Sequence, residues 1–146
     1  MTPEQFLDWI TSDACKRQFL QISADQIQKN LDFGFERDVD PHGTPWVPLS
    51  QSYLASKRKR LSKHPRDKLE LTGALRRASR EYTIDGTRGL RFTLGTKAAS
   101  YGAVHMTGSK NLPKRPFYLV DGEPLPDRFR VGIVEGITRL ILAVTH

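Results

Sequence analysis

The chain has almost no cysteine: Cys15 is the only one among 146 residues. A single thiol excludes an internal disulfide and a zinc site built from several thiolates. Long apolar runs are absent too, since the longest, Leu140–Val144, is far shorter than the roughly 20 residues that cross a bilayer. The first ten residues contain acids and no basic segment, which is not the pattern of a secretory signal. Together with the length, these absences favour a single domain over residues 1–146, working inside a cell without a membrane partner.

Patterns typical of catalysis, cofactor binding or metal binding are missing as well. Neither a glycine-rich phosphate loop nor a nucleophile elbow occurs, and the four histidines have no metal-ligand spacing. His105 is the one histidine in a segment expected to be ordered. It could act as a general base or a ligand, but a structural histidine with one hydrogen-bond partner is the commoner case. The sequence therefore predicts no enzyme, no cofactor and no metal, and a hydrolase using His105 stays an alternative.

The net charge of +7 is unevenly distributed. Residues 1–52 carry −4, residues 53–80 carry +8 and residues 81–146 carry +3. The basic excess thus lies in one block, residues 57–80, beside an acidic N-terminal third. Such a block could bind nucleic-acid phosphates without sequence specificity, form a solvated helix face, or meet an acidic surface of a neighbouring protein. No helix-turn-helix, zinc-finger or aromatic stacking pattern accompanies it, so base-specific recognition is not expected.

Capping signals and apolar spacing predict a long helical N-terminal region. Thr2 can cap a helix whose first residue is Pro3, a favoured position for proline. Ser12 can cap a second helix that continues to about Leu31. Phe33–Phe35 departs from helical spacing and is predicted to be a short extended segment.

The middle of the chain is predicted to be a proline-rich loop followed by two helices. Residues 40–50 contain three prolines, and Trp46 and Leu49 are the inward anchors of this otherwise polar loop. A helix from Ser50 to about Leu61 follows, and a short helix around residues 75–78 carries two more basic side chains, Arg76 and Arg77.

The second half of the chain is predicted to supply the sheet and the last helix. The alternating pattern over residues 82–96, broken by a Gly-containing turn, indicates a β-hairpin. A small-residue turn and a proline loop follow, then a short strand at Tyr118–Val120. Asp127 can cap a final helix, whose expected buried face comprises Val131, Val134, Ile137, Leu140 and Ile141. The fold class is therefore α+β, a small antiparallel sheet packed by amphipathic helices.

The rest of the chain is expected to hold the stretch Leu94–Phe117 in place. Its end, Pro113-Lys-Arg-Pro-Phe117, is predicted to be a stiff basic loop, because each proline fixes its own φ and pushes the preceding residue into an extended conformation. Phe117 would anchor it. A stiff charged loop pinned by aromatic residues suits contact with another macromolecule.

Five short motifs in fixed order add up to a family resemblance. They are Asp40-Pro-His-Gly-Thr-Pro-Trp-Val-Pro-Leu49, Leu71-Thr-Gly-Ala-Leu75, Leu94-Gly-Thr96, Tyr101-Gly-Ala-Val-His-Met-Thr-Gly108 and Leu112-Pro-Lys-Arg-Pro-Phe117. In order and spacing the chain resembles the phage virion morphogenesis (tail completion) family, similar to proteins of contractile-tailed phages, over about residues 1–141. Gly102 departs from the pattern, where alanine is expected after the tyrosine.

The resemblance implies a structural assembly protein without enzymatic activity. Such a protein acts in the virion at the head–tail junction, after assembly in the host cytoplasm, and completes the tail or joins it to the capsid connector. A homo-oligomeric ring is expected, sixfold by analogy with tail symmetry or alternatively twelvefold. The implied partners are the tail terminator or tail tube, the head connector or head-completion proteins, and DNA only as it passes through the channel.

In this interpretation two groups of residues have distinct roles. The first shapes and anchors the loops: Trp46, Leu49, Leu75, Tyr101, His105 and Phe117. The second presents charge to a neighbouring subunit, the tail terminator or the connector: Arg76, Arg77, Lys114 and Arg115. Charge reversal at Arg115 is then expected to leave the fold intact and to block ring formation or head–tail joining. His105→Gln is expected to preserve assembly.

Overall fold

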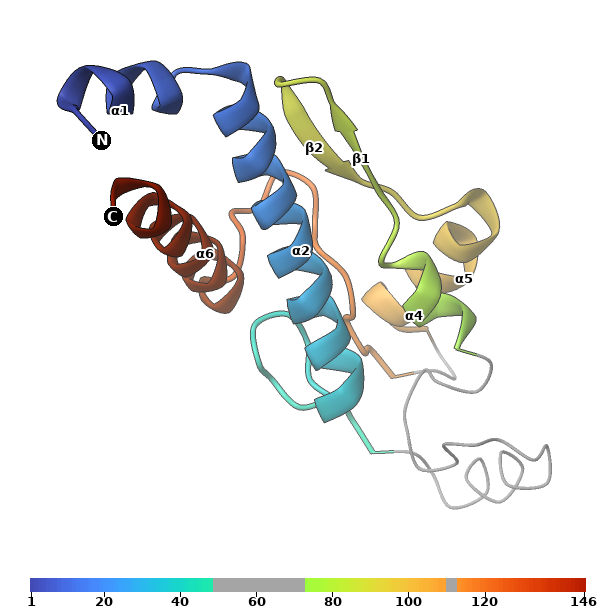
Figure 1. Cartoon of the computed structure of the whole chain (residues 1–146). Helices are drawn as coiled ribbons and strands as arrows, with labels where there is room; N and C mark the ends of the chain where they lie inside the picture. The colour runs from blue at the N-terminus through green and yellow to red at the C-terminus, as the bar shows by residue number, and fades with distance from the viewer. Residues whose placement is uncertain (49–72, 110–112) are drawn as a thin grey trace.

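A long central helix organises the molecule. The computed structural model describes residues 1–48, 73–109 and 113–146, and for residues 96–101 the backbone alone. Helix α2 (Asp13–Arg37) runs through the middle, with helix α6 (Asp127–Thr145) along one side (Figure 1). Strands β1 (Tyr82–Asp85) and β2 (Gly89–Phe92) and helices α4 (Ala74–Ala78) and α5 (Thr96–Thr107) lie on the other side. The class is α+β, as the sequence predicts.

Both predicted N-terminal caps are present. Helix α1 (Pro3–Ile10) begins with a capping box, in which the Thr2 side chain accepts from the backbone N–H of Gln5 and the Gln5 side chain accepts from that of Thr2. Ser12 caps α2 by accepting from the backbone N–H of Cys15 at 3.1 Å. Although α1 is well capped, none of its residues is buried.

Helix α2 is longer than the sequence pattern predicts. The expected extended segment Phe33–Phe35 is wrong, because the helix continues to Arg37 and ends at Asp38 with a left-handed φ of 55°. The chain then folds back over the helix end, so that a Cβ at Gly34 would lie 2.9 Å from the carbonyl oxygen of Val39. Gly34 therefore interrupts the apolar spacing because a side chain there would collide with the returning chain. The helix itself continues through this position.

Helix α6 approaches α2 closely at two glycines. A Cβ at Gly136 would lie 2.6 Å from Cγ2 of Ile22, and one at Gly132 would lie 2.6 Å from Oε1 of Gln26. Both distances are shorter than real Cβ contacts allow. The absence of side chains at these positions decides which face of α6 turns inward.

The inward face of α6 differs from the one that apolar spacing predicts. Phe129 is fully buried, whereas the predicted core positions Val131 and Val134 are 54% and 62% exposed. The predicted cap also differs, because Pro126 occupies the cap position without a side-chain hydrogen bond. Asp127 is instead the first residue of the helix, where it forms an ion pair with Arg130 and its charge complements the helix dipole.

The predicted hairpin is confirmed, with a second strand shorter than expected. Tyr82 pairs with Phe92 and Asp85 with Gly89 in an antiparallel register. Two neighbouring predictions are wrong. The small-residue turn is part of helix α5, and residues 118–120 form no strand in the structure. The described residues form two hydrophobic cores. The first consists of Phe35, Trp46, Leu75 and Phe117, and the second of Ile27, Leu31 and Phe129.

Candidate docking surface

The two proline-containing loops, residues 38–48 and 113–117, are fastened to each other. The indole N–H of Trp46 donates to the carbonyl oxygen of Pro116 at 2.6 Å. The Trp46 ring, 4% exposed, meets the Phe35 ring edge-on with centroids 5.8 Å apart. Phe35 in turn contacts the Phe117 ring at the same centroid distance. The loops are therefore built around one aromatic cluster that ties them to the end of α2.

Arg115 lies in the interior, and its expected role as a surface charge is corrected. The residue is 6% exposed. Its Nε donates to the carbonyl oxygen of Val47 at 2.8 Å and its Nη2 to that of Pro48 at 3.1 Å. Its backbone N–H donates to the carbonyl oxygen of His105 at 2.7 Å. The buried guanidinium thus binds the two loops together through carbonyl groups of the first loop.

The inward orientation of Arg115 follows from the two prolines of its loop. Because Pro113 and Pro116 favour an extended chain, successive side chains point to opposite sides. Lys114 is exposed, while Arg115 and Phe117 share the inward side. Placing Phe117 in the core therefore places Arg115 there too. This alternation could have been predicted from the sequence. Of the two loop charges, Lys114 alone is presented outward.

Helix α5 packs against the loop of residues 113–117. His105 is 5% exposed on the buried side of α5, and Met106 Sδ accepts from the backbone N–H of Phe117 at 3.4 Å. A Cβ at Gly102 would lie 2.8 Å from Cζ of Phe117, so the glycine that departs from the family pattern is required by this aromatic ring. The structure places Tyr101 in α5 but does not describe its side chain.

The environment of His105 favours the neutral imidazole. Burial lowers the pKa of His105 below its usual 6.5, and the nearby Arg115 guanidinium lowers it further. A neutral, buried ring between loop and helix fits a structural histidine.

This lowered pKa predicts a pH-dependent loss of stability. Below about pH 6.5 the unfolded chain binds a proton at His105 before the folded chain does, so the free energy of unfolding falls as the pH drops. His105→Gln should remove that part of the slope. We expect urea titrations from about pH 7.5 to about pH 5 to show a steeper loss for the wild type than for this variant.

The exposed His42 provides a matched control for that measurement. His42→Gln removes a histidine that is not buried, so it should keep the steep wild-type dependence. Parallel pH profiles for the wild type and His105→Gln would contradict the assignment.

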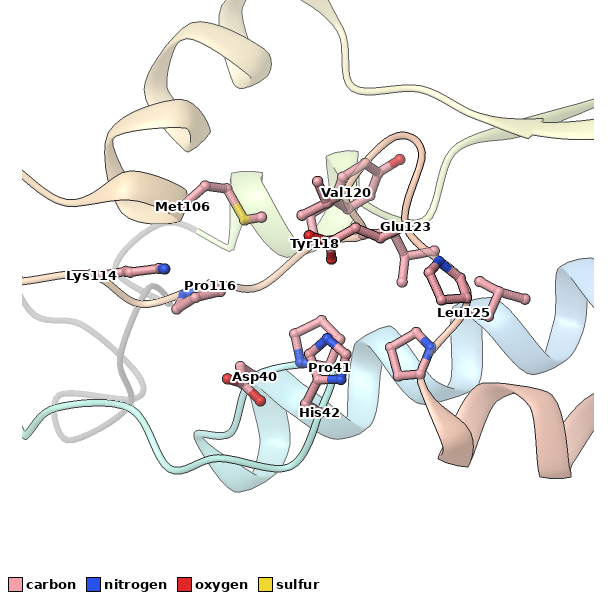
Figure 2. Close-up of a pocket in the computed structure, with 13 residues that line it drawn as sticks. Asp40, Pro41, His42, Met106, Lys114, Pro116, Tyr118, Val120, Glu123 and Leu125 are labelled. Atoms are coloured by element: carbon pink, nitrogen blue, oxygen red, sulfur yellow. The ribbon is translucent and has the colours of Figure 1, made fainter.

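A cavity of about 220 Å³ opens between the loops (Figure 2). Pro41 and His42 lie on one wall, and Pro116, Tyr118 and Leu125 lie across from them. Charged side chains, among them Lys114 and Glu123, stand at its rim. The volume is below the roughly 300–1,000 Å³ of typical small-molecule sites. Its apolar walls and charged rim suit the side chain of a docked protein better than a substrate.

Tyr118 adds a polar group that stays uncharged. Burial, with a contribution from Asp121, raises the pKa of its phenol to about 12. The ring contacts Phe117 with centroids 5.9 Å apart and packs against both cores. Sequence spacing does not identify this joining role, because the segment was predicted to be a strand.

Two arginines, one in α4 and one just after it, face acidic side chains of α2. Asp32 accepts from Nε of Arg76 at 3.4 Å and from Nη1 of Arg80 at 2.6 Å. Arg76 also pairs with Glu36 at 3.0 Å. Arg76 therefore forms ion pairs within the protomer, and its role as an interface charge stays a prediction. Arg77 is exposed.

Part of the predicted site lies outside the described residues. That part includes Leu49, the predicted helix from Ser50 to Leu61 and the basic residues 57–72. Leu75 is 3% exposed in the aromatic cluster. Phe35 belongs to the same cluster but was missed, because its segment was interpreted as extended.

Residues 1–48, 73–109 and 113–146 contain no group of three or more His, Cys, Asp or Glu side chains that could hold a metal ion. None of the helices found there is long and apolar enough to cross a membrane.

Comparison with known proteins gives one match. The model of the phage virion morphogenesis family matches residues 6–135. No curated protein and no solved structure is significantly similar to the chain. The matched range includes α2, the hairpin, both proline loops and the first half of α6, so it covers the whole candidate docking surface.

Proposed function

We propose that this chain, which belongs to the phage virion morphogenesis family, is a structural subunit of the head–tail junction. Its coarser role, in building phage particles, follows from the family. The finer proposal is that it completes the tail or joins it to the capsid connector. The match over residues 6–135 carries this proposal, since it covers both fastened loops.

The geometry of the docking surface supports a structural role. Trp46 and Arg115 fix two loops whose outer sides remain available, and the cavity between them is small. Rigid, pre-formed surfaces lose little conformational entropy when they dock. The charged rim, including Lys114, can set the orientation of a partner.

We further propose that several copies form a ring around the DNA channel. A ring requires head-to-tail contacts between different faces of the subunit, with a rotation that closes. Sixfold symmetry is the first expectation and twelvefold symmetry the second. The proposed partners are the tail terminator or tail tube on one side and the head connector or head-completion proteins on the other.

Particles made without this protein test the proposal. In the phage that encodes it, deletion of its gene should leave filled heads and separate tails in electron micrographs, and supplying the protein should restore joined particles. A density map of the restored particles should place it between capsid and tail. Normal joined particles in its absence, or density elsewhere in the virion, would overturn the proposal.

A further inference from the structure

Helix α6 carries an apolar stripe on the face turned away from α2. Val131, Val134 and Leu142 are 54%, 62% and 51% exposed. With the exposed Thr138 they follow a spacing of three, four and four residues, which places them on one side of the helix. The buried Phe129 and Gly136 lie on the opposite side. The stripe is about 16 Å long, since a helix rises about 1.5 Å per residue.

Two opposite charges border this stripe on the same flank. A helix turns about 100° per residue, and this places Glu135 and Arg139 on the same side of the stripe, next to Leu142. Both are exposed, and in the described part of the molecule neither forms an ion pair, although their spacing of four residues would allow one. The other flank, at Ile137 and Ile141, carries one charge, Arg130, whose guanidinium pairs with Asp127.

We propose that two copies of this chain pair through antiparallel α6 helices, stripe against stripe. In an antiparallel pair the same flanks of the two helices face each other, so Glu135 of each copy meets Arg139 of its partner. The same register sets Val131 opposite Leu142. A parallel pair would instead place Arg139 against the apolar part of the other flank, where it would be desolvated without a partner. The stripe is thus complementary to itself in charge and in apolar side chains.

This contact goes beyond the proposed junction role. An isologous contact closes after two copies, so it cannot build a ring, whose contacts must use other faces. The junction has the head on one side and the tail on the other, so its two ends differ. A two-fold axis relating two subunits end to end is incompatible with that difference. The pair therefore belongs to the free protein before assembly, where it covers apolar surface that would otherwise face water.

Charge swaps on the full-length chain test the pair. Glu135→Arg alone and Arg139→Glu alone each replace two attractive contacts by two repulsive ones. We expect the wild type to show concentration-dependent dimers in sedimentation equilibrium, and each single variant to dimerise about tenfold more weakly or worse. An equimolar mixture of the two single variants should recover dimers, because arginine pairs then face glutamate pairs. The double variant Glu135→Arg/Arg139→Glu should also recover them.

Glu81→Arg is the matched control, since it makes the same charge change at an exposed residue next to the hairpin, away from α6, and should leave dimerisation unchanged. All substituted positions are exposed, so circular dichroism should show wild-type folding. A monomeric wild type, single variants that dimerise as well as it does, or a mixture that fails to recover would overturn the pair. Larger closed rings that are unaffected by either swap would overturn it while supporting the junction proposal.

Discussion

Arg115→Glu is expected to lower the free energy of unfolding by about 3–5 kcal/mol, the usual effect of leaving a buried charge without its partners. The arginine is 6% exposed and donates to the carbonyl oxygens of Val47 and Pro48. Glutamate has no proton to donate there, and its charge would face two partial negative charges. Because a small domain has only about 5–15 kcal/mol of stability, the loss would be a large part of the total. Urea denaturation followed by circular dichroism measures it.

Lys114→Glu provides the comparison at the neighbouring position. Lys114 is exposed, so the same change of charge should alter the free energy of unfolding by less than about 0.5 kcal/mol. If the Arg115 variant were as stable as the Lys114 variant, the inward position of Arg115 would be wrong. From the sequence alone, Arg115→Glu is expected to fold and to fail in assembly. The buried position of Arg115 reverses the first part of that expectation. A failure to assemble would now follow from the loss of the folded loop structure.

Local signals in the sequence predicted the elements that depend on local contacts. Thr2 and Ser12 cap helices because their side chains satisfy backbone N–H groups a few residues away. The hairpin depends on alternation and on a turn, both visible within about fifteen residues. These features need no knowledge of distant parts of the chain.

The elements that were missed depend on distant contacts. Gly34, Gly102 and Gly136 each stand where another segment comes close, at Val39, Phe117 and Ile22. In the sequence a glycine inside a helical pattern weakens the prediction of a helix. The predicted N-terminal helical region therefore ends before Gly34, and the small residues ahead of Tyr101 are predicted to form a turn. The structure shows that these glycines are positions of close packing.

The orientation of α6 shows the same limit in another way. Apolar residues occur on two faces of the helix, so periodicity alone could not decide which face is buried. Gly132 and Gly136 decide it, because the face without side chains can approach α2 most closely. Val131 and Val134 are left outside, so the stripe proposed to pair two copies includes two residues first expected in the core.

Trp46→Ala is expected to have an effect of similar size, about 3–5 kcal/mol of unfolding free energy, as for other buried tryptophans. The side chain is 4% exposed, contacts the Phe35 ring and donates to the carbonyl oxygen of Pro116. Its removal would leave a cavity between both loops and α2. Trp9, which contacts Phe19 with ring centroids 6.4 Å apart, remains as a fluorescent reporter of unfolding in the variant.

Trp46→Phe separates the two contributions of the indole. Phenylalanine keeps an aromatic ring against Phe35 but cannot donate to Pro116, so an expected loss of about 1–3 kcal/mol reflects the unpaired carbonyl oxygen and the smaller ring. Val47→Ala, at a neighbouring residue that is 49% exposed, should cost less than about 0.5 kcal/mol. Equal losses for the alanine and phenylalanine variants would assign the fastening of the loops to the hydrogen bond. A loss below about 1 kcal/mol for Trp46→Ala would contradict the aromatic cluster as their anchor, because a truncated core tryptophan cannot be that well tolerated.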